Sequence, residues 1–274
     1  MMIPLPPHQL EKTRPLLAPL AEHLLIVPSI LAGLTPATVY VDDVAEPHTA
    51  VTWFHGRVII AGQVDAQRLT AVRHLLLTEY QRETQSANLD VLLMYSTPEW
   101  QAAAADLLPD LKMIAATRCY YRLDARSREW QTAVPDGLQL RRVDASLLAD
   151  STLNNLDWVT EEMVSERPSV ADFLDKSFGY CLVHQNNIVA WCMSEYNTGN
   201  RCELGIATAE AWQRQGLAKV TATAVIAEAS QRGIHDIGWI CWANNLPSVH
   251  TAEALGFSRV QEKLVYLFFW QNAL

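Results

Sequence analysis

The chain has 274 residues, half of them hydrophobic, so it can bury a core that suffices for two lobes or one large domain. Its net charge is −9 and it has no block of basic residues, which argues against a nucleic-acid-binding surface. Five cysteines without a C-x-x-C pair support neither a disulfide framework nor a zinc site, and no apolar stretch approaches the ~20 residues that span a bilayer. We therefore expect a cytoplasmic protein without metal, nucleic-acid or membrane partners.

The first half of the chain predicts strands, then a helix, a strand, a helix and a strand. Leucines interrupted by prolines suggest helix in residues 8–25, and Gly56-Arg57 predicts a hairpin between the second and third strands. The expected strands are 38–41, 50–55, 58–61, 89–95 and 113–123, and the expected helices are 66–82 and 100–108.

Residues 124–137 are polar and rich in turn formers, which predicts a linker at 125–136. The linker would separate an N-terminal lobe, residues 1–124, from a C-terminal domain, residues 137–274.

The expected strands of the C-terminal domain are 138–143, 178–184, 188–195, 202–208, 237–243 and 258–269, with helices at 145–164 and 169–177 and a long alanine-rich helix after 216. The pattern predicts a mixed α/β fold. Because 264–270 is apolar on both faces, we expect the other lobe or a second subunit to cover it.

A turn at residues 212–219 joins an apolar strand to the alanine-rich helix. Gly216 permits close approach of a ligand to the backbone, and Ala218 keeps the first helical turn slim. The uncovered amides and the helix dipole favour an anion such as a phosphate, with Arg214 and Lys219 as the nearby positive groups. Taken alone, Q-x-x-G-x-A equally describes a glycine that opens a helix.

A second motif, N-x-x-S, begins at Asn245 after the apolar run 237–242. Pro247 suits the first turn of a helix, and Gly256, eleven residues after the asparagine, suits its end. Asn245 and Ser248 could also serve only as helix caps.

In order and spacing, these elements resemble the GNAT acyltransferase superfamily: Q/R-x-x-G-x-G/A, then N-x-x-S/A, then Gly256-Phe257. Residues 178–180, 192–196, 203–208 and 241–242 resemble the subgroup that includes the zwittermicin A resistance acetyltransferase. The resemblance covers about half the chain, residues 137–270. The first half has the same coarse element order but neither motif, so we interpret it as a degenerate copy; an ordinary α/β lobe would give a similar order. The resemblance thus implies two GNAT-like lobes.

The resemblance implies acetyl-CoA as donor and direct attack by an amine on the thioester. It also implies that the 206–208 backbone pairs with pantetheine, that amides of the turn hold the pyrophosphate, and that Asn245 contacts pantetheine. The implied cofactor-binding residues are Ile206, Ala207, Thr208, Gln213, Arg214, Gln215, Gly216, Leu217, Ala218, Lys219, Asn245 and Ser248.

Glu203 is our first candidate for the base that deprotonates the amine, since a carboxylate within an apolar strand has a raised pKa. A solvent-facing strand residue would explain Glu203 equally. Glu195 and His250 are the next candidates, and an exposed helical residue would explain His250. Many GNAT members carry a tyrosine acid seven residues after the asparagine, where this chain has Ala252. Tyr196 or a water could protonate the thiolate instead, or no acid is needed.

We expect the acceptor pocket to draw on Trp158, Glu161, Glu162, Ser194 and Tyr196, whose acidic members suit a cationic amine; a solvated helix face explains the glutamates equally. The predicted function is N-acetylation of a small-molecule amine by a monomer or homodimer. Alternatives are an acyl-CoA-binding regulatory or scaffold protein without turnover, and acetylation of a protein or peptide amine. The acceptor itself cannot be read from the sequence.

Overall fold

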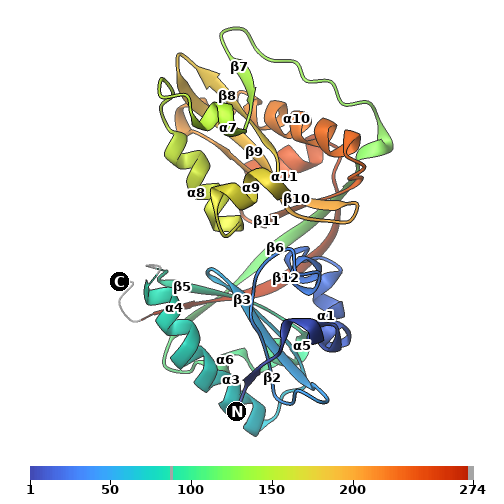
Figure 1. Ribbon diagram of the computed structural model, residues 1–274, viewed down its shortest axis with the longest axis vertical. Coiled ribbons are helices and arrows are strands. Elements are labelled where there is room, and N and C mark those ends of the chain that lie inside the picture. Colours follow the sequence, from blue (N-terminus) through green and yellow to red (C-terminus); the bar gives the residue numbers. More distant parts are fainter. Residues whose placement is uncertain (87–88, 271–274) are drawn as a thin grey trace. The chain divides into compact units, whose positions relative to one another are not determined.

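A computed structural model describes residues 1–86 and 89–270. The chain forms two compact units (Figure 1): one contains described residues of Met1–Arg118 together with residues 263–270, and the other is Cys119–Glu262. Two strands, β6 (Lys112–Asp124) and β12 (Ser258–Phe269), begin in one unit and end in the other. Every helix among the described residues is too short or too polar to cross a membrane.

The first unit is built on a mixed sheet with the strand order β1-β2-β3-β4-β5-β12. Strands β3 and β4 form the predicted hairpin, β5 runs parallel to β4, and the end of β12 pairs antiparallel with β5. The strands are β1 (Ile3–Pro4), β2 (Val39–Val41), β3 (Thr49–Phe54), β4 (Arg57–Gly62) and β5 (Val91–Ser96). The helical segments are η1 (Pro7–Thr13), α1 (Arg14–Ala21), α2 (Ile26–Leu31), α3 (Ala66–Leu75), η2 (Leu76–Tyr80), α4 (Gln81–Ser86), α5 (Pro98–Ala102) and α6 (Ala104–Leu107).

The core of the first unit needs the end of the chain. Fully buried Val58, Leu92 and Trp100 belong to one cluster that also contains Phe268 and Trp270. Phe268 has no exposed surface, and its register partner on β5 is Leu92. Phe268 and Trp270 are therefore covered by the N-terminal part of the chain, whereas Leu264, at the start of the expected apolar segment, is 49% exposed.

The second unit contains the strand order β11-β10-β9-β8-β7. These strands are β7 (Gln139–Arg142), β8 (Gly179–His184), β9 (Asn187–Thr198), β10 (Arg201–Thr208) and β11 (Asp236–Trp242). The helical segments are η3 (Ala125–Ser127), α7 (Ala145–Leu148), α8 (Leu156–Glu166), α9 (Val170–Lys176), η4 (Glu210–Trp212), α10 (Leu217–Gln231) and α11 (Leu246–Ala254). The expected helix 145–164 is thus two helices, with Asn155 in the left-handed region (φ 64°) between them.

Helices cover both faces of this sheet (Figure 1). Side chains of α10 and α11 pack with one set of strand residues, which includes Cys202, Leu204 and Trp239. Side chains of α8 and α9 pack with the opposite set, which includes Trp191 and Met193. Because successive side chains of β9 and β10 point to opposite faces of the sheet, neighbouring residues on these strands face different helices.

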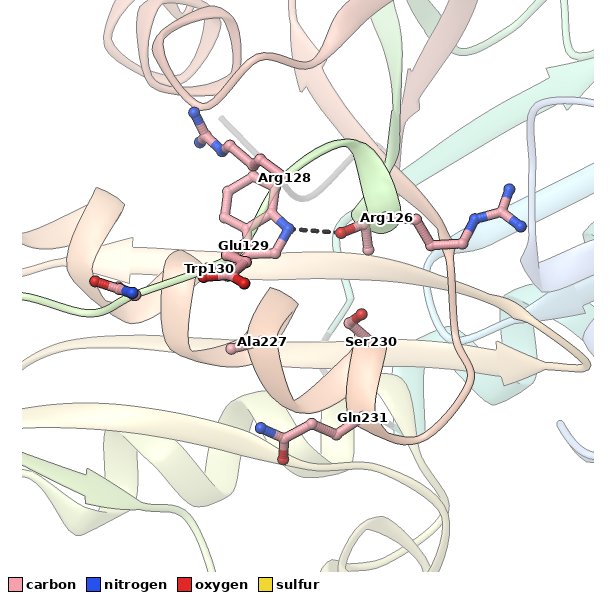
Figure 2. A pocket seen from close by; sticks show the side chains of 9 residues that line it. Arg126, Arg128, Glu129, Trp130, Ala227, Ser230 and Gln231 are labelled. Carbon is pink, nitrogen blue, oxygen red and sulfur yellow. Dashed lines mark hydrogen bonds between the residues drawn. The ribbon is translucent and has the colours of Figure 1, made fainter.

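The compact units differ from the expected lobes at two places. The C-terminal segment belongs to the first unit because it pairs with β5. The start of the expected linker packs within the second unit: Ala125 N–H donates to His235 O at 2.8 Å, and Trp130 Nε1 donates to Ala125 O at 2.7 Å (Figure 2). The polar composition predicted a linker, and these contacts attach its first residues to the second unit at His235.

A fragment of residues 137–274 should be poorly soluble, because it carries Phe268 and Trp270 without the core that buries them. We expect large oligomers or precipitate in size-exclusion chromatography. A fragment of residues 119–262, which is the second compact unit with its own core residues from β6 and without that apolar segment, should remain monomeric at the same concentration. A monodisperse monomer of 137–274 would contradict this prediction.

Candidate functional site

Strands β10 and β11 pair over only part of their lengths. Their parallel register covers Arg201↔Asp236, Cys202↔Ile237 and Glu203↔Gly238. Beyond Glu203 and Gly238, β10 continues to Thr208 and β11 to Trp242 without further pairing between them. The edge of β10 at residues 204–208 therefore faces away from its partner β9 and offers backbone groups to an extended ligand.

The turn before α10 presents a concentration of amide donors. Gly216 is the N-cap residue in the left-handed region (φ 80°), no side chain caps the helix, and Arg214 is also left-handed (φ 61°). The N–H groups of residues 215–218 have no acceptor in the part of the chain that the structure describes. Together with the dipole of the 15-residue helix α10, these amides form an anion site, the amide cradle. The exposed side chains of Arg214 and Lys219 add positive charge beside it.

A cavity of about 750 Å³ joins this turn to the open edge of β10. Every predicted cofactor-binding residue lines it except Gln215, and Trp212, Trp239, Leu246, Pro247, His250 and Thr251 line it as well. Thr208 Oγ1 is buried beside the cavity and has no hydrogen-bond partner among the described residues. An orphaned hydroxyl, an open strand edge and an amide cradle together fit a ligand with a pyrophosphate and a polar, amide-containing arm.

The N-x-x-S motif builds the opposite wall of the cavity. Asn245 Oδ1 accepts the Ser248 N–H at 3.3 Å, so the asparagine does cap α11, and its side chain also lines the cavity. Ser248 Oγ accepts a hydrogen bond from Trp239 Nε1 at 3.0 Å. Sequence reasoning missed Trp239 because the apolar run 237–242 has the composition of a core strand.

Two glycines make room for carboxylates where β10 and β11 part. A Cβ at Gly238 would come within 2.9 Å of Glu203 Cγ, so the Glu203 side chain lies over this glycine. A Cβ at Gly205 would overlap Glu195 Oε1 and come within 2.9 Å of Glu162 Oε1. Glu195 and Glu203 are direct cross-strand partners. The carboxylates therefore gather at the end of the paired segment.

Helix α8 supplies the rest of this acidic group. Carboxylate oxygens of Glu162, Glu166 and Glu195 lie within 4.8 Å of one another. Trp158, one turn before Glu162, packs edge-on against Trp191 with ring centroids 5.7 Å apart. Two of the five predicted acceptor residues, Trp158 and Glu162, thus lie on the face that carries Glu195.

Of the remaining predicted residues, Tyr196 contacts the acidic group through Glu166, whereas Glu161, Ser194 and His250 lie outside that group. Glu161 is exposed, and His250 is an exposed residue of α11 at the cofactor cavity. Ser194 is fully buried, where its Oγ accepts hydrogen bonds from Phe178 N–H and Asn197 Nδ2, both at 3.0 Å. Tyr196 is buried and donates its hydroxyl to Glu166 Oε2. The two residues therefore have internal partners that their polar character in a strand did not reveal.

Three buried thiols of this sheet, those of Cys181, Cys192 and Cys202, have raised pKa values. Burial raises the pKa of Cys181 to about 12. Burial also raises the pKa of Cys192 and Cys202, with a further contribution from the negative charge of Glu195 or Glu203. These thiols stay protonated at neutral pH, so none of them is a candidate for an acyl-cysteine intermediate.

A second hollow lies at the other end of α10 (Figure 2). It has a volume of about 640 Å³ and is lined by residues 125–131 together with Ala227, Ser230 and Gln231. The Arg128 guanidinium stacks 4.0 Å from the centroid of the Trp130 ring. Since α10 rises by about 1.5 Å per residue, the hollow is on the order of 20 Å from the amide cradle.

The cavity, the amide cradle and the carboxylates lie together in the second unit. The family model for GNAT acetyltransferases matches residues 16–266, and the chain therefore belongs to the GNAT acetyltransferase family. It is 29% identical over 239 residues to the uncharacterized N-acetyltransferase YdfB of Bacillus subtilis, covering 87% of this chain and 88% of that protein.

Solved structures share the fold over nearly the whole chain. A GCN5-related N-acetyltransferase-like protein from Streptococcus suis matches with a TM-score of 0.67 and 20% identity, covering 95% of this chain and 99% of that one. A tandem GNAT protein from the clavulanic acid biosynthesis pathway matches with a TM-score of 0.59 and 13% identity, covering 97% of each chain. The protein is an acyltransferase with two GNAT-like lobes, as its sequence predicted.

Gly216→Asp should abolish the stabilisation of the protein by acetyl-CoA, the donor implied by the family. A ligand that binds only the native state raises the melting temperature, and a carboxylate in the anion cradle would repel the pyrophosphate. Gly216→Asn is the matched control, because asparagine has the same shape, tolerates the left-handed region and carries no charge. A shift that survives in Gly216→Asp, measured by thermal denaturation, would show that the phosphates bind elsewhere.

Proposed function

We propose that this protein transfers the acetyl group of acetyl-CoA to the amine of a small molecule by direct attack. The observation that carries the proposal is the single cavity joining the amide cradle of α10 to the open edge of β10, with carboxylates at the end of that edge. Acetyl-CoA would supply the activated acetyl thioester. The resemblance to the subgroup that includes the zwittermicin A resistance acetyltransferase favours a small amine acceptor.

The chain's own groups hold the donor at two places. The amides of residues 215–218 bind the pyrophosphate, and Arg214 and Lys219 neutralise it locally in a protein of net charge −9. The edge of β10 at residues 206–208 hydrogen-bonds the pantetheine arm as an added strand, and Thr208 Oγ1 gains a partner. With the pyrophosphate and the pantetheine arm held in this way, the thioester would lie near the point where β10 and β11 stop pairing.

The acceptor amine approaches from the face that carries α8. Glu195 and Glu203 are cross-strand neighbours there, and Glu162 extends the negative charge onto α8. An ammonium is attracted to this group, and one carboxylate then removes its proton so that the nitrogen can attack. His250 lies on the cofactor side of the site, so the carboxylates fit the base role better. Burial raises the pKa of Cys192 and Cys202, which favours direct transfer over a two-step route through either of these thiols.

A thiol-release assay over diverse amines tests the function directly. The panel should include aminoglycosides and polyamines, because an acidic recess favours cationic acceptors. Release of CoA that depends on the amine supports the proposal. Binding of acetyl-CoA without release on any amine would contradict it.

One CoA should bind per chain. The first unit lacks the Q-x-x-G-x-A turn after its hairpin, so it has no amide cradle equivalent to residues 215–218. Titration calorimetry of the full chain is expected to give a stoichiometry of one, and Gly216→Asp to remove that site. A stoichiometry of two CoA molecules per chain would contradict this prediction. So would a CoA site that is still present in Gly216→Asp, because either result would place a cofactor in the first unit.

Glu203→Gln should lower turnover by about 10²–10⁴-fold while leaving CoA affinity nearly unchanged. Glutamine keeps the size of the side chain over Gly238 but cannot accept a proton at neutral pH. The wild-type rate should rise with pH through the pKa of the base, and this limb should flatten in the variant.

Glu195→Gln is the competing variant and Glu161→Gln the control, since Glu161 is exposed and outside the acidic group. Normal turnover of Glu203→Gln together with a large loss in Glu195→Gln would move the base to β9.

A further inference from the structure

Ser248 has its hydroxyl fixed in orientation by a neighbouring indole. Trp239 Nε1 donates to Ser248 Oγ at 3.0 Å, and the Trp239 ring is 2% exposed and packs edge-on against Phe257 with centroids 5.5 Å apart. The indole occupies an acceptor position of the serine oxygen, which leaves the serine O–H available to donate. Among the described residues no acceptor takes this proton, and Ser248 lines the cofactor cavity.

The position of Ser248 along the cavity follows from the strands. The cavity runs from the amide cradle at residues 215–218 toward the last paired residues of β10 and β11. Thr208 lies at the cradle end, where Gln213 Nε2 donates to its carbonyl oxygen at 3.3 Å. Glu203 is five residues earlier on β10, about 17 Å away at the rise of a strand. Trp239 directly follows Gly238, the partner of Glu203, so it holds Ser248 at the reacting end.

We propose that Ser248 donates a hydrogen bond to the sulfur of CoA and stabilises it as a leaving thiolate, with Trp239 as its positioning residue; this rests on the proposed function. The amine lone pair forms the new C–N bond, the C–S bond breaks, and its electron pair stays on sulfur. The carboxylate base takes the amine proton. Ser248 keeps its own proton and shares it with the thiolate, which later acquires a proton from water.

Other hydroxyls near the site are already committed or lie at the wrong end. Thr251 Oγ1 donates to Pro247 O at 2.7 Å, and the Tyr196 hydroxyl donates to Glu166. Thr208 lies at the cradle end. Ala252 has no donor and is fully buried in the core. Among these hydroxyls of the described residues, Ser248 is therefore the one that remains available for the sulfur.

The thiol pKa of bound CoA tests the proposal without catalysis. The ultraviolet absorbance of the thiolate is titrated with pH for CoA bound to the wild type, Ser248→Ala and Ser248→Thr. A donor to the thiolate favours the charged form, so the bound thiol should have a lower pKa in the wild type than in Ser248→Ala. We expect a difference of about one pKa unit, a tenfold change in the ionisation constant. Ser248→Thr keeps the hydroxyl and should restore the lower value.

The same variants should separate binding from turnover. Ser248→Ala is expected to lower kcat about 10–100-fold with little change in the affinity for desulfo-CoA, which lacks the sulfur. Trp239→Phe removes the indole N–H and should shift both the thiol pKa and kcat in the same direction by a smaller amount. Ser230→Ala, at the far end of α10, is the control and should behave as the wild type.

Distinct results would overturn each part. An unchanged thiol pKa and kcat in Ser248→Ala would remove the serine from the reaction, and wild-type behaviour of Trp239→Phe would remove the positioning role. If the wild type neither binds CoA nor releases thiol with any amine, the proposed function fails; if it does both and Ser248→Ala is unaffected, only the inference about Ser248 fails.

Discussion

The end of pairing between β10 and β11 after Glu203 and Gly238 is the constraint on which the site depends. Backbone groups of a strand edge need partners, and a protein that leaves them unpaired beside a cavity loses stability unless water or a ligand satisfies them. The edge of β10 leads from this point to the turn at Gly216, where more amides are uncapped. The two sets of donors lie on one cavity, so an extended anionic ligand can satisfy both.

Negatively charged side chains gather at the point where β10 and β11 stop pairing, and their mutual repulsion must be offset. Gly205 and Gly238 provide space for Glu195 and Glu203 directly over the backbone. Charges held this close repel one another and lose hydration. Arg167 is 1% exposed beside this group: burial lowers its pKa, while the negative charges of Asp172, Glu166 and Glu195 act in the opposite direction. A buried guanidinium thus offsets part of the repulsion on the acceptor side.

The features predicted correctly are those that short segments encode. A left-handed Gly216 before a helix and an asparagine cap at Asn245 depend on residues close in sequence, and both are present. The packing of 125–131 and the pairing of β12 with β5 depend on contacts between distant segments, which composition does not report. Ser194 illustrates the limit within the site: a serine in a strand suggests a substrate contact, but here it satisfies the Phe178 amide.

The structure also explains how the site is arranged without an aromatic residue at position 252. Ser248 and Ala252 are one turn apart on α11 and so lie on the same side of the helix. Ala252 is fully buried in the core cluster that also contains Trp239 and Phe257, so a large side chain there would have to displace its packed neighbours. The indole of Trp239 fills the space between β11 and α11 from the strand side. The indole N–H donates to the hydroxyl of Ser248. Trp239 therefore supplies the aromatic ring and Ser248 the hydroxyl, the two groups that a single tyrosine at position 252 would combine.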